Sequence, residues 1–246
     1  MKYKTACVLA ILAIGQFAFA LDADQILVKV DEHRSVSDSF RFQIKIDDYT
    51  NGALVQTALM TGYAKGANKS MVEYDEPANM KGKKLLMVDD DFSIFIPKTQ
   101  RPVRLTPSQR LMGQASNGDV MNVRFQIDYT PVITGEETVT VDGEKHDCVV
   151  LDLTARRKGS AYSRIVLRAE KETWLPVNAD CYALSGKKLK TVEYSTVKTF
   201  DGKPVVAKTV LHDLVLKDSY TVIEFTDMKN ETIPDNYFIK EYLMRM

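Results

Sequence analysis

The most constraining feature of the chain is a segment in which apolar and polar side chains alternate without interruption. The apolar positions of residues 39–46 are Phe40, Phe42, Ile44 and Ile46, and the polar positions between them are Arg41, Gln43 and Lys45. Because successive side chains of a strand point to opposite faces, this pattern predicts a strand with one buried face. Any fold for this chain must therefore supply an apolar surface opposite that face.

Further strand-like segments follow at short intervals and are separated by marked turns. Those before the middle of the chain are residues 54–64, 70–74, 84–88 and 92–97, and those after it are 138–141, 147–155, 163–170, 175–184, 188–199, 205–216 and 219–228. The turns include Asp142-Gly143, Ser185-Gly186 and Asp201-Gly202, which are typical of hairpins. About 11 short strands cannot form one flat sheet, so the sequence predicts a mainly β (α+β) fold built on an incomplete antiparallel β-barrel.

Few segments have a helical pattern. Residues 24–33 carry Ile26, Leu27 and Val30 at helical spacing, and a second helix is expected over 108–115, with Thr106 as its N-cap and Pro107 in its first turn. Residues 116–119 are expected to break that helix, with Val120 and Met121 in another possible helical turn, and a last short helix is expected after residue 233. Because the concave face of the barrel carries the apolar positions, these few helices are expected to cover it as a lid over an apolar cavity.

The first 20 residues have the pattern of a cleaved signal peptide. Lys2 and Lys4 precede an apolar run that ends in Ala18-Phe19-Ala20, a small-residue cleavage site. The expected product is a single domain over residues 21–246, exported to the periplasm. The whole chain has 33 basic and 33 acidic residues, a balance that argues against nucleic acid as a partner.

Two cysteines lie in the part of the chain that would be exported. Cys148 and Cys181 could pair in an oxidising compartment. The expected strand order places another strand between them, which separates them by about 9–10 Å and favours two small buried thiols instead. Pairing remains the alternative at this stage.

The chain lacks the common catalytic and metal-binding motifs. No nucleophile elbow, phosphate-binding loop, dinucleotide fingerprint or zinc-protease helix is present, and the three histidines are scattered. Asp89-Asp90-Asp91 is typical of a solvated turn rather than of a calcium loop. We therefore expect no catalytic residue, no metal and no cofactor, and a protein that is not an enzyme.

Several segments, taken in order, carry a resemblance to a known family. They are residues 23–27, residues 91–97 with 101–105, residues 108–113 with 117–119, residues 174–177 with 182–187, and residues 233–235 with Phe238 and Leu243. Together they resemble the LolA-like family of outer-membrane lipoprotein-sorting proteins, in the branch associated with resistance-nodulation-division (RND) exporters. The resemblance implies a lidded, incomplete barrel whose apolar cavity takes acyl chains.

The residues expected to line the ligand cavity and to form its lid follow from the alternation and the resemblance together. The expected cavity wall consists of Phe40, Phe42, Ile44, Ile46, Phe92, Ile94, Phe125, Ile127 and Trp174, with Leu111 and Met112 in the lid. Each of these side chains could instead belong to an ordinary core.

Three functions are compatible with this reading. The first is a monomeric periplasmic carrier of a Gram-negative bacterium that moves lipoprotein acyl chains or lipid toward the outer membrane, with an inner-membrane RND- or ABC-type transporter as partner. The second is a non-shuttling accessory or docking subunit of an RND-type exporter. The third is an envelope enzyme acting on a lipid, for which the sequence supplies no cluster of titratable groups.

Overall fold

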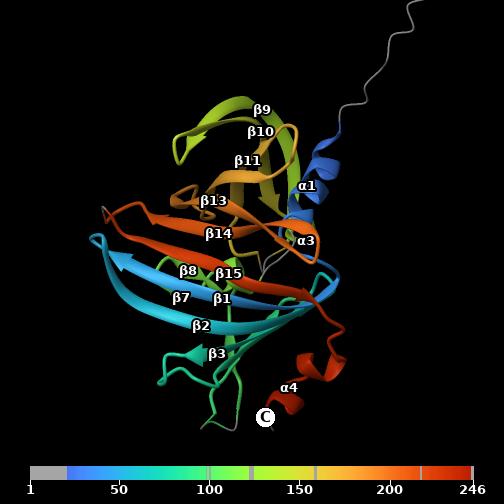
Figure 1. Ribbon diagram of the computed structural model, residues 1–246, viewed down its shortest axis with the longest axis vertical. Coiled ribbons are helices and arrows are strands. Elements are labelled where there is room, and N and C mark those ends of the chain that lie inside the picture. Colours follow the sequence, from blue (N-terminus) through green and yellow to red (C-terminus); the bar gives the residue numbers. More distant parts are fainter. Residues whose placement is uncertain are drawn as a thin grey trace, which may run out of the picture.

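The chain folds around one large antiparallel sheet (Figure 1), in a computed structural model that describes residues 21–97, 99, 101–121, 125–157, 160–216 and 218–244. The first half contains α1 (Ala23–Glu32), β1 (Ser39–Thr50), β2 (Ala53–Lys65), β3 (Lys69–Glu76), β4 (Lys84–Val88), β5 (Asp91–Phe95), β6 (Val103–Leu105), β7 (Arg110–Met112), β8 (Ala115–Ser116), α2 (Asn117–Met121) and α3 (Phe125–Asp128). The second half contains β9 (Tyr129–Val141), β10 (Glu144–Ala155), β11 (Arg164–Glu170), β12 (Pro176–Tyr182), β13 (Lys188–Phe200), β14 (Lys203–Asp213), β15 (Tyr220–Asn230), a 3-10 turn η1 (Asp235–Phe238) and α4 (Lys240–Leu243). The expected signal peptide lies outside the described residues.

The sheet order explains why a lid exists. Thirteen strands follow the order β6-β5-β4-β3-β2-β1-β15-β14-β13-β12-β11-β10-β9. The chain thus runs outward from β1 to one edge and must then reach the opposite edge to begin β9. The described residues 106–121 and 125–128 make this passage, and we refer to them as the crossing segment. The expectation of an open, strongly curved antiparallel sheet with few helices is confirmed (Figure 1).

Helix α1 forms where the sequence predicts it. Asp22 accepts a hydrogen bond from the backbone N–H of Gln25 at 2.8 Å, and the Gln25 side chain accepts one from Asp22 N–H at 3.0 Å. This reciprocal capping box satisfies two N–H groups that the helix leaves free at its first turn. The apolar face of Ile26, Leu27 and Val30 is buried in the main core.

The helix expected over residues 108–115 is wrong. The chain forms the two-stranded hairpin β7–β8 there, because Gly113 at the turn has φ +54°, a left-handed conformation that ends any helix. The break expected at residues 116–119 is also wrong, since α2 begins at Asn117, but the helical turn expected at Val120 and Met121 is present as the end of α2. Ser116 N–H donates to Asp119 Oδ2 at 2.7 Å and Asp119 N–H donates to Ser116 Oγ at 3.4 Å, which is a capping box that starts α2.

The sheet contains two stretches of strand that the sequence did not predict. Strand β6 was not expected, and β9 begins at Tyr129 rather than Thr138. Strand β9 forms an edge of the sheet and most of its side chains are exposed. A strand exposed on both faces has no apolar alternation, so the periodic signal was absent over most of its length.

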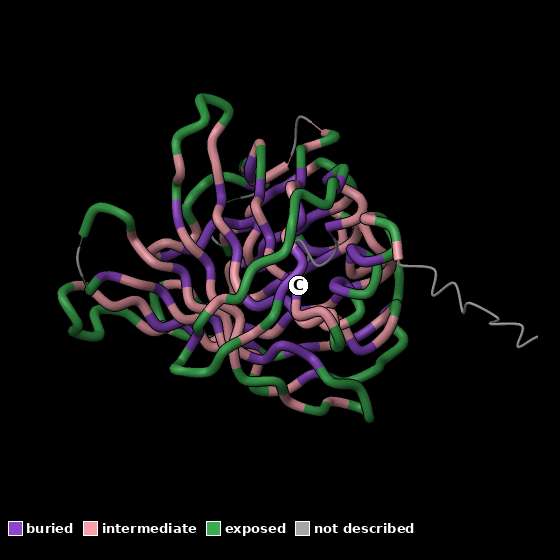
Figure 2. The backbone as a smooth tube through the Cα atoms, turned by 90° about the horizontal axis from the view of Figure 1, so that it is seen from above, coloured by how far each residue is buried: buried purple, intermediate pink, exposed green. Residues whose placement is uncertain are grey.

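The N-terminal half of the sheet contributes to two apolar clusters. Figure 2 shows buried residues gathered in the interior and exposed residues in the protruding loops. The main core includes the inward face of β1 and buried residues of α1, α2 and α3. A second cluster joins Met71, Leu86 and Phe95 of the sheet to the C-terminal segment through Ile233, Phe238 and Leu243. The expected last helical segment is therefore present as η1 and α4, packed against β3 and β4.

The two cysteines are buried free thiols. Cys148 lies on β10 and Cys181 on β12, with β11 between them as expected. Burial raises the pKa of the Cys148 thiol to about 11 and raises that of Cys181 further above its ordinary value. No helix among the described residues is long and apolar enough to cross a membrane.

Candidate functional site

A mostly apolar cavity lies between the crossing segment and the strands of the C-terminal half. Its lining comes from α2, α3, strands β9 and β11 to β15, and the connections that hold Arg34, Ala161 and Tyr162. The lining residues are Arg34, Gly118, Asp119, Val120, Phe125, Tyr129, Ala161, Tyr162, Ile165, Cys181, Val192, Tyr194, Val206, Thr209, Leu211, Ile223 and Phe225. An apolar pocket with a few polar groups at its edge is the usual form of a small-molecule site.

The cavity is small as it stands. Its volume is about 70 Å³, which is room for a few water molecules. A long acyl chain needs several times this space. The crossing segment forms one wall of the cavity through Gly118, Asp119, Val120 and Phe125.

A polar network at the cavity edge holds helix α2 in place. Asp119 Oδ2 accepts from Lys190 Nζ of β13 at 2.9 Å, and Asp119 Oδ1 accepts from the Tyr162 hydroxyl at 2.6 Å. Lys190 Nζ also donates to the Gln114 carbonyl and lies 5.3 Å from the centre of the Tyr162 ring. The side chains of Lys190 and Asp119 are only 8% and 12% exposed, so their attraction is weakly screened by solvent.

The hairpin β7–β8 is fixed to three different strands of the sheet. Gln114 N–H donates to Thr221 Oγ1 at 2.7 Å, and Gln114 Nε2 donates to Asp213 Oδ2 at 2.6 Å. Thr221 Oγ1 in turn donates to Asp48 Oδ1 of β1 at 2.8 Å. Together with the Lys190–Asp119 pair, these contacts hold the crossing segment closed, and all of them are polar contacts that water can replace.

Helix α1 positions the other end of the crossing segment. The Asp31 carboxylate accepts from the N–H groups of Phe125 and Gln126 at 2.8 and 2.9 Å, which caps the start of α3. The Arg34 guanidinium lies 4.0 Å from the centre of the Phe125 ring, within the range of a cation–π contact. Phe125 is thereby held in the cavity wall.

Three tyrosines in the lining remain protonated at neutral pH. Burial raises the pKa of Tyr129, Tyr162 and Tyr194 well above the ordinary value, and the adjacent Asp119 carboxylate raises that of Tyr162 further. Their hydroxyl groups therefore act as neutral hydrogen-bonding groups. Among the described residues, no group of histidine, cysteine and carboxylate side chains is arranged to hold a metal ion.

The expected wall residues lie in different places. Phe125 lines the cavity, and Phe42 contacts it indirectly through the Phe225 ring, whose centre is 5.8 Å away. The four apolar side chains of β1 are buried in the main core beside the cavity. Phe92 and Ile127 line a separate, smaller pocket with Arg157.

The remaining expected residues surround the same core. Ile94 is partly buried against it from β5, and Trp174 packs on it from the β11–β12 turn, where its φ is +60°. Leu111 and Met112 belong to the hairpin rather than to a helix, but they do lie in the crossing segment and contact the core.

Sequence reasoning missed the polar residues of the site. Lys190 could have been found, because it shares one face of its strand with the apolar Val192 and Tyr194 and is therefore an inward-pointing charge. Asp119 could have been found from its capping-box spacing to Ser116. The contacts of Tyr129 and Tyr162 had no local signal, since they depend on the packing of distant strands.

Comparison with known proteins agrees with this architecture. A family model described only as an uncharacterized protein family matches residues 66–245. No match was found among curated proteins.

Solved structures match the chain over most of its length. A LolA superfamily protein from Nitrosomonas europaea is 31% identical, with a TM-score of 0.82 over 91% of this chain and 100% of the other. A DUF1329 family protein from Desulfovibrio piger is 25% identical, with a TM-score of 0.75 over 89% and 97%. A domain from Vibrio parahaemolyticus described as an outer membrane lipoprotein-sorting protein is 19% identical and shares the fold, with a TM-score of 0.74 over 91% and 98%. The chain belongs to the LolA superfamily.

Proposed function

We propose that the protein is a periplasmic carrier that takes the acyl chains of lipoproteins or lipids into its cavity and moves them toward the outer membrane. The observation that carries this proposal is an apolar cavity covered by the crossing segment, which polar contacts and side-chain packing hold in place. The similarity to a protein described as an outer membrane lipoprotein-sorting domain supports it. Residues 1–20 would direct export and be removed, leaving 21–246 as one monomeric domain.

The free energies explain why a carrier needs such a lid. Burial of one methylene contributes about 0.8 kcal/mol, so a chain of about 15 methylenes gains roughly 12 kcal/mol before costs. That gain corresponds to roughly nanomolar affinity, from which release is slow. Opening the lid must offset part of it, because a carrier works best when its closed empty and open loaded states are nearly equal in free energy.

The polar network supplies an opening cost of suitable size. Separating Lys190 from Asp119 and Gln114 from Asp213 gives up charge-assisted hydrogen bonds, each worth about 1.5–3 kcal/mol in net terms. These net values already include the hydrogen bonds that water makes to the separated groups in the open form. The total is therefore a fraction of the acyl-chain gain, which permits loading and keeps release possible.

Opening would also enlarge the wall. We propose that Val120, Phe125 and Ile223 contact the acyl chain first. The buried face of β1 (Phe40, Phe42, Ile44 and Ile46) would become accessible beyond Phe225 as the hairpin lifts. Leu111 and Met112 would then form the moving cover, and methionine is suited to repacking around chains of different shape.

Binding of a fluorescent fatty acid tests the cavity, and its displacement from the wild type by natural lipid extracts identifies competing ligands. Ile223→Trp adds bulk where Ile223 lines the cavity, and should abolish binding of the fluorescent fatty acid. Ile133→Trp makes the same change at an exposed position of β9 and should bind like the wild type. Equal binding by a folded Ile223→Trp variant would contradict the proposed site.

Identification of co-purifying molecules tests the carrier role itself. Protein exported to the periplasm and purified without detergent should carry lipid or acylated peptide that mass spectrometry detects. A stable complex with a membrane exporter and no bound lipid would instead indicate the non-shuttling accessory role. An inner-membrane RND- or ABC-type transporter is the expected donor for a carrier.

A further inference from the structure

A group of exposed apolar side chains gathers at one end of the sheet, away from the cavity lining. Its members come from the start of β2 and from the β12–β13 and β14–β15 connections, and we refer to them as the apolar tips: Leu54, Val55, Leu184, Leu214, Val215 and Leu216. Val215 is 83% exposed and Leu184 is 94% exposed. Exposed clusters of large apolar side chains are uncommon in monomers and mark interaction surfaces.

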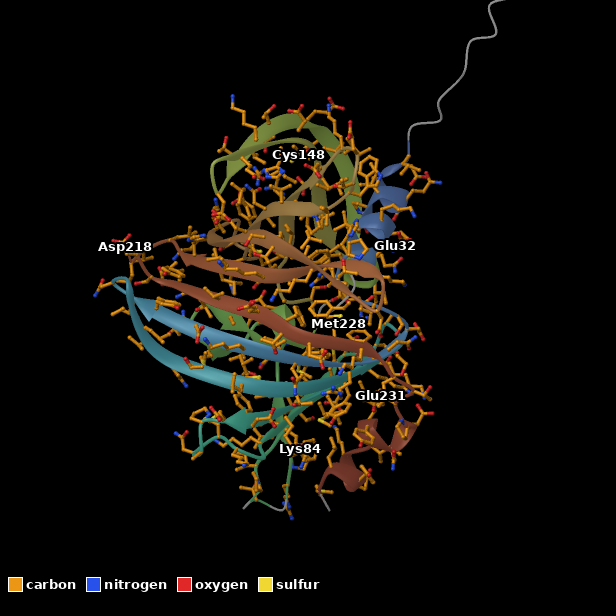
Figure 3. All side chains as sticks on the ribbon, viewed as in Figure 1. Glu32, Lys84, Cys148, Asp218, Met228 and Glu231 are labelled. Carbon is orange, nitrogen blue, oxygen red and sulfur yellow. The ribbon has the colours of Figure 1, made fainter. Side chains whose placement is uncertain are left out.

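The strand register brings the three segments to the same end. Tyr49 of β1 pairs with Tyr220 of β15, and Lys190 of β13 pairs with Asp213 of β14. Gly52 N–H donates to the Asp218 carbonyl at 2.8 Å, which joins the β1–β2 turn to the β14–β15 connection. Figure 1 shows these two connections side by side at the left edge, and Figure 3 labels Asp218 there.

Several described backbone groups of the β14–β15 tip are hydrogen-bonded within the protein. Asp213 Oδ1 accepts from the N–H groups of Val215 and Leu216 at 2.7 and 3.0 Å, and the Leu216 carbonyl accepts from Ser219 N–H. Protein backbone that leaves water must have its polar groups paired, because lipid offers no hydrogen-bond partner. The tip thus presents apolar side chains without needing water for these backbone groups.

Two tyrosines stand directly behind the tips. The rings of Tyr49 and Tyr220 stack with centres 4.6 Å apart and an interplanar angle of 15°, and both side chains are partly exposed. Aromatic rings with one apolar and one polar end concentrate at the boundary between lipid and water. Tyr49 is paired with Leu54 of the tips across the β1–β2 ladder, so the two rings lie beside the apolar side chains.

From these observations we propose that the apolar tips form a membrane-docking surface whose partner is the surface of a phospholipid bilayer. Protruding apolar side chains at one end of the sheet, with the partly exposed Tyr49–Tyr220 pair beside them, suit insertion between lipid headgroups. This surface goes beyond the acyl-chain cavity and does not depend on it. Asp213 links the two regions, because its Oδ2 atom holds Gln114 of the crossing segment while Oδ1 shapes the tip.

Flotation with vesicles tests the surface. The cleaved protein should float with phosphatidylcholine vesicles, and raised salt or added phosphatidylglycerol should change this little, because apolar insertion rather than charge drives it. Val215→Asp and Leu184→Asp should each lower partitioning about tenfold or more. Val132→Asp changes an exposed valine of β9 that is remote from the tips and should leave partitioning unchanged.

Three results would overturn the proposal. Absence of wild-type flotation, or equal loss in Val215→Asp and Val132→Asp, would mean that the tips have no special affinity for lipid. The cavity variant Ile223→Trp must still float. If it fails to float while Val215→Asp floats, adsorption occurs through the cavity and the docking surface is wrong, whereas floating of Ile223→Trp without fatty-acid binding separates the two proposals.

Discussion

Lys190 Nζ lies 2.9 Å from Asp119 Oδ2, and this contact joins the meander of the C-terminal half to helix α2 of the crossing segment. Both side chains are nearly buried. Removing one partner leaves the other as an uncompensated charge in a region of low polarity, which costs more than the pair itself contributes. The pair is therefore a sensitive point for both stability and lid opening.

Lys190→Met should lower the free energy of unfolding by about 3–5 kcal/mol, as expected for a buried pair that loses one charge. The double variant Asp119→Asn with Lys190→Met should recover part of that loss, because neither charge is then buried alone. Urea denaturation of the four proteins in a double-mutant cycle gives the coupling energy. The exposed pair Lys29–Glu32, with N and O atoms 3.0 Å apart, is the control and should couple by less than about 1 kcal/mol. A similar coupling energy at the two sites would contradict this interpretation.

The same double variant should bind fatty acid more tightly than the wild type. If opening the lid requires separation of Lys190 from Asp119, loss of the pair reduces the work of opening and leaves the acyl-chain gain unchanged. An increase of about tenfold in affinity corresponds to about 1.4 kcal/mol of saved work. Titration with the fluorescent fatty acid measures it, and an unchanged affinity would show that the pair does not resist opening.

Buried phenols make the protein sensitive to alkali. Burial raises the pKa of Tyr74 to about 12, and the pKa values of Tyr129, Tyr162 and Tyr194 are raised as well. Above pH 10 the unfolded chain loses these protons while the folded chain keeps them, so stability is full below pH 10 and falls as the pH rises beyond it. Each group contributes a slope of about 1.4 kcal/mol per pH unit.

Urea unfolding between pH 9 and 12 should show this loss, with phenolate absorbance from the buried tyrosines appearing together with unfolding. Tyr74→Phe should reduce the slope between pH 10 and 12 by the contribution of one group. Ionisation of these tyrosines in a chain that is still folded at pH 10 would contradict the assignment.

Much of the sheet was predictable because its strands obey a local rule. Strand β1 alternates from Ser39 to Ile46, and the turns of the second half carry the glycine and aspartate residues that hairpins require. The crossing segment was not predictable in the same way, because Gly113 turns the chain at a point where its neighbours favour a helix. Such a competition is decided by tertiary contacts rather than by local propensity.

The site was predictable only in its general character. Inward-facing apolar side chains could be identified, but which of them border the cavity depends on where the crossing segment lies. That segment covers β13 to β15 and holds Phe125 over Tyr129, so the cavity forms there and the face of β1 packs beside it. This relation joins residues far apart in the chain and leaves no periodic trace in the sequence.

Gly113 offers a direct test of how closely the hairpin approaches the sheet. Its φ is +54°, and a Cβ atom added there would lie 2.0 Å from Asp48 Oδ1 and 2.2 Å from Thr221 Oγ1. Gly143 is a matched control, because its φ is +85° and an added Cβ would have no neighbour within 4 Å. Alanine at either position incurs the backbone strain of about 1–2 kcal/mol for a left-handed residue. Only Gly113→Ala must also displace the hydrogen bonds that Thr221 makes with Gln114 and Asp48, at about 1 kcal/mol each. The free energy of unfolding should therefore fall by about 2 kcal/mol more for Gly113→Ala than for Gly143→Ala in urea denaturation, and equal losses would mean that the hairpin does not sit against the sheet at this point.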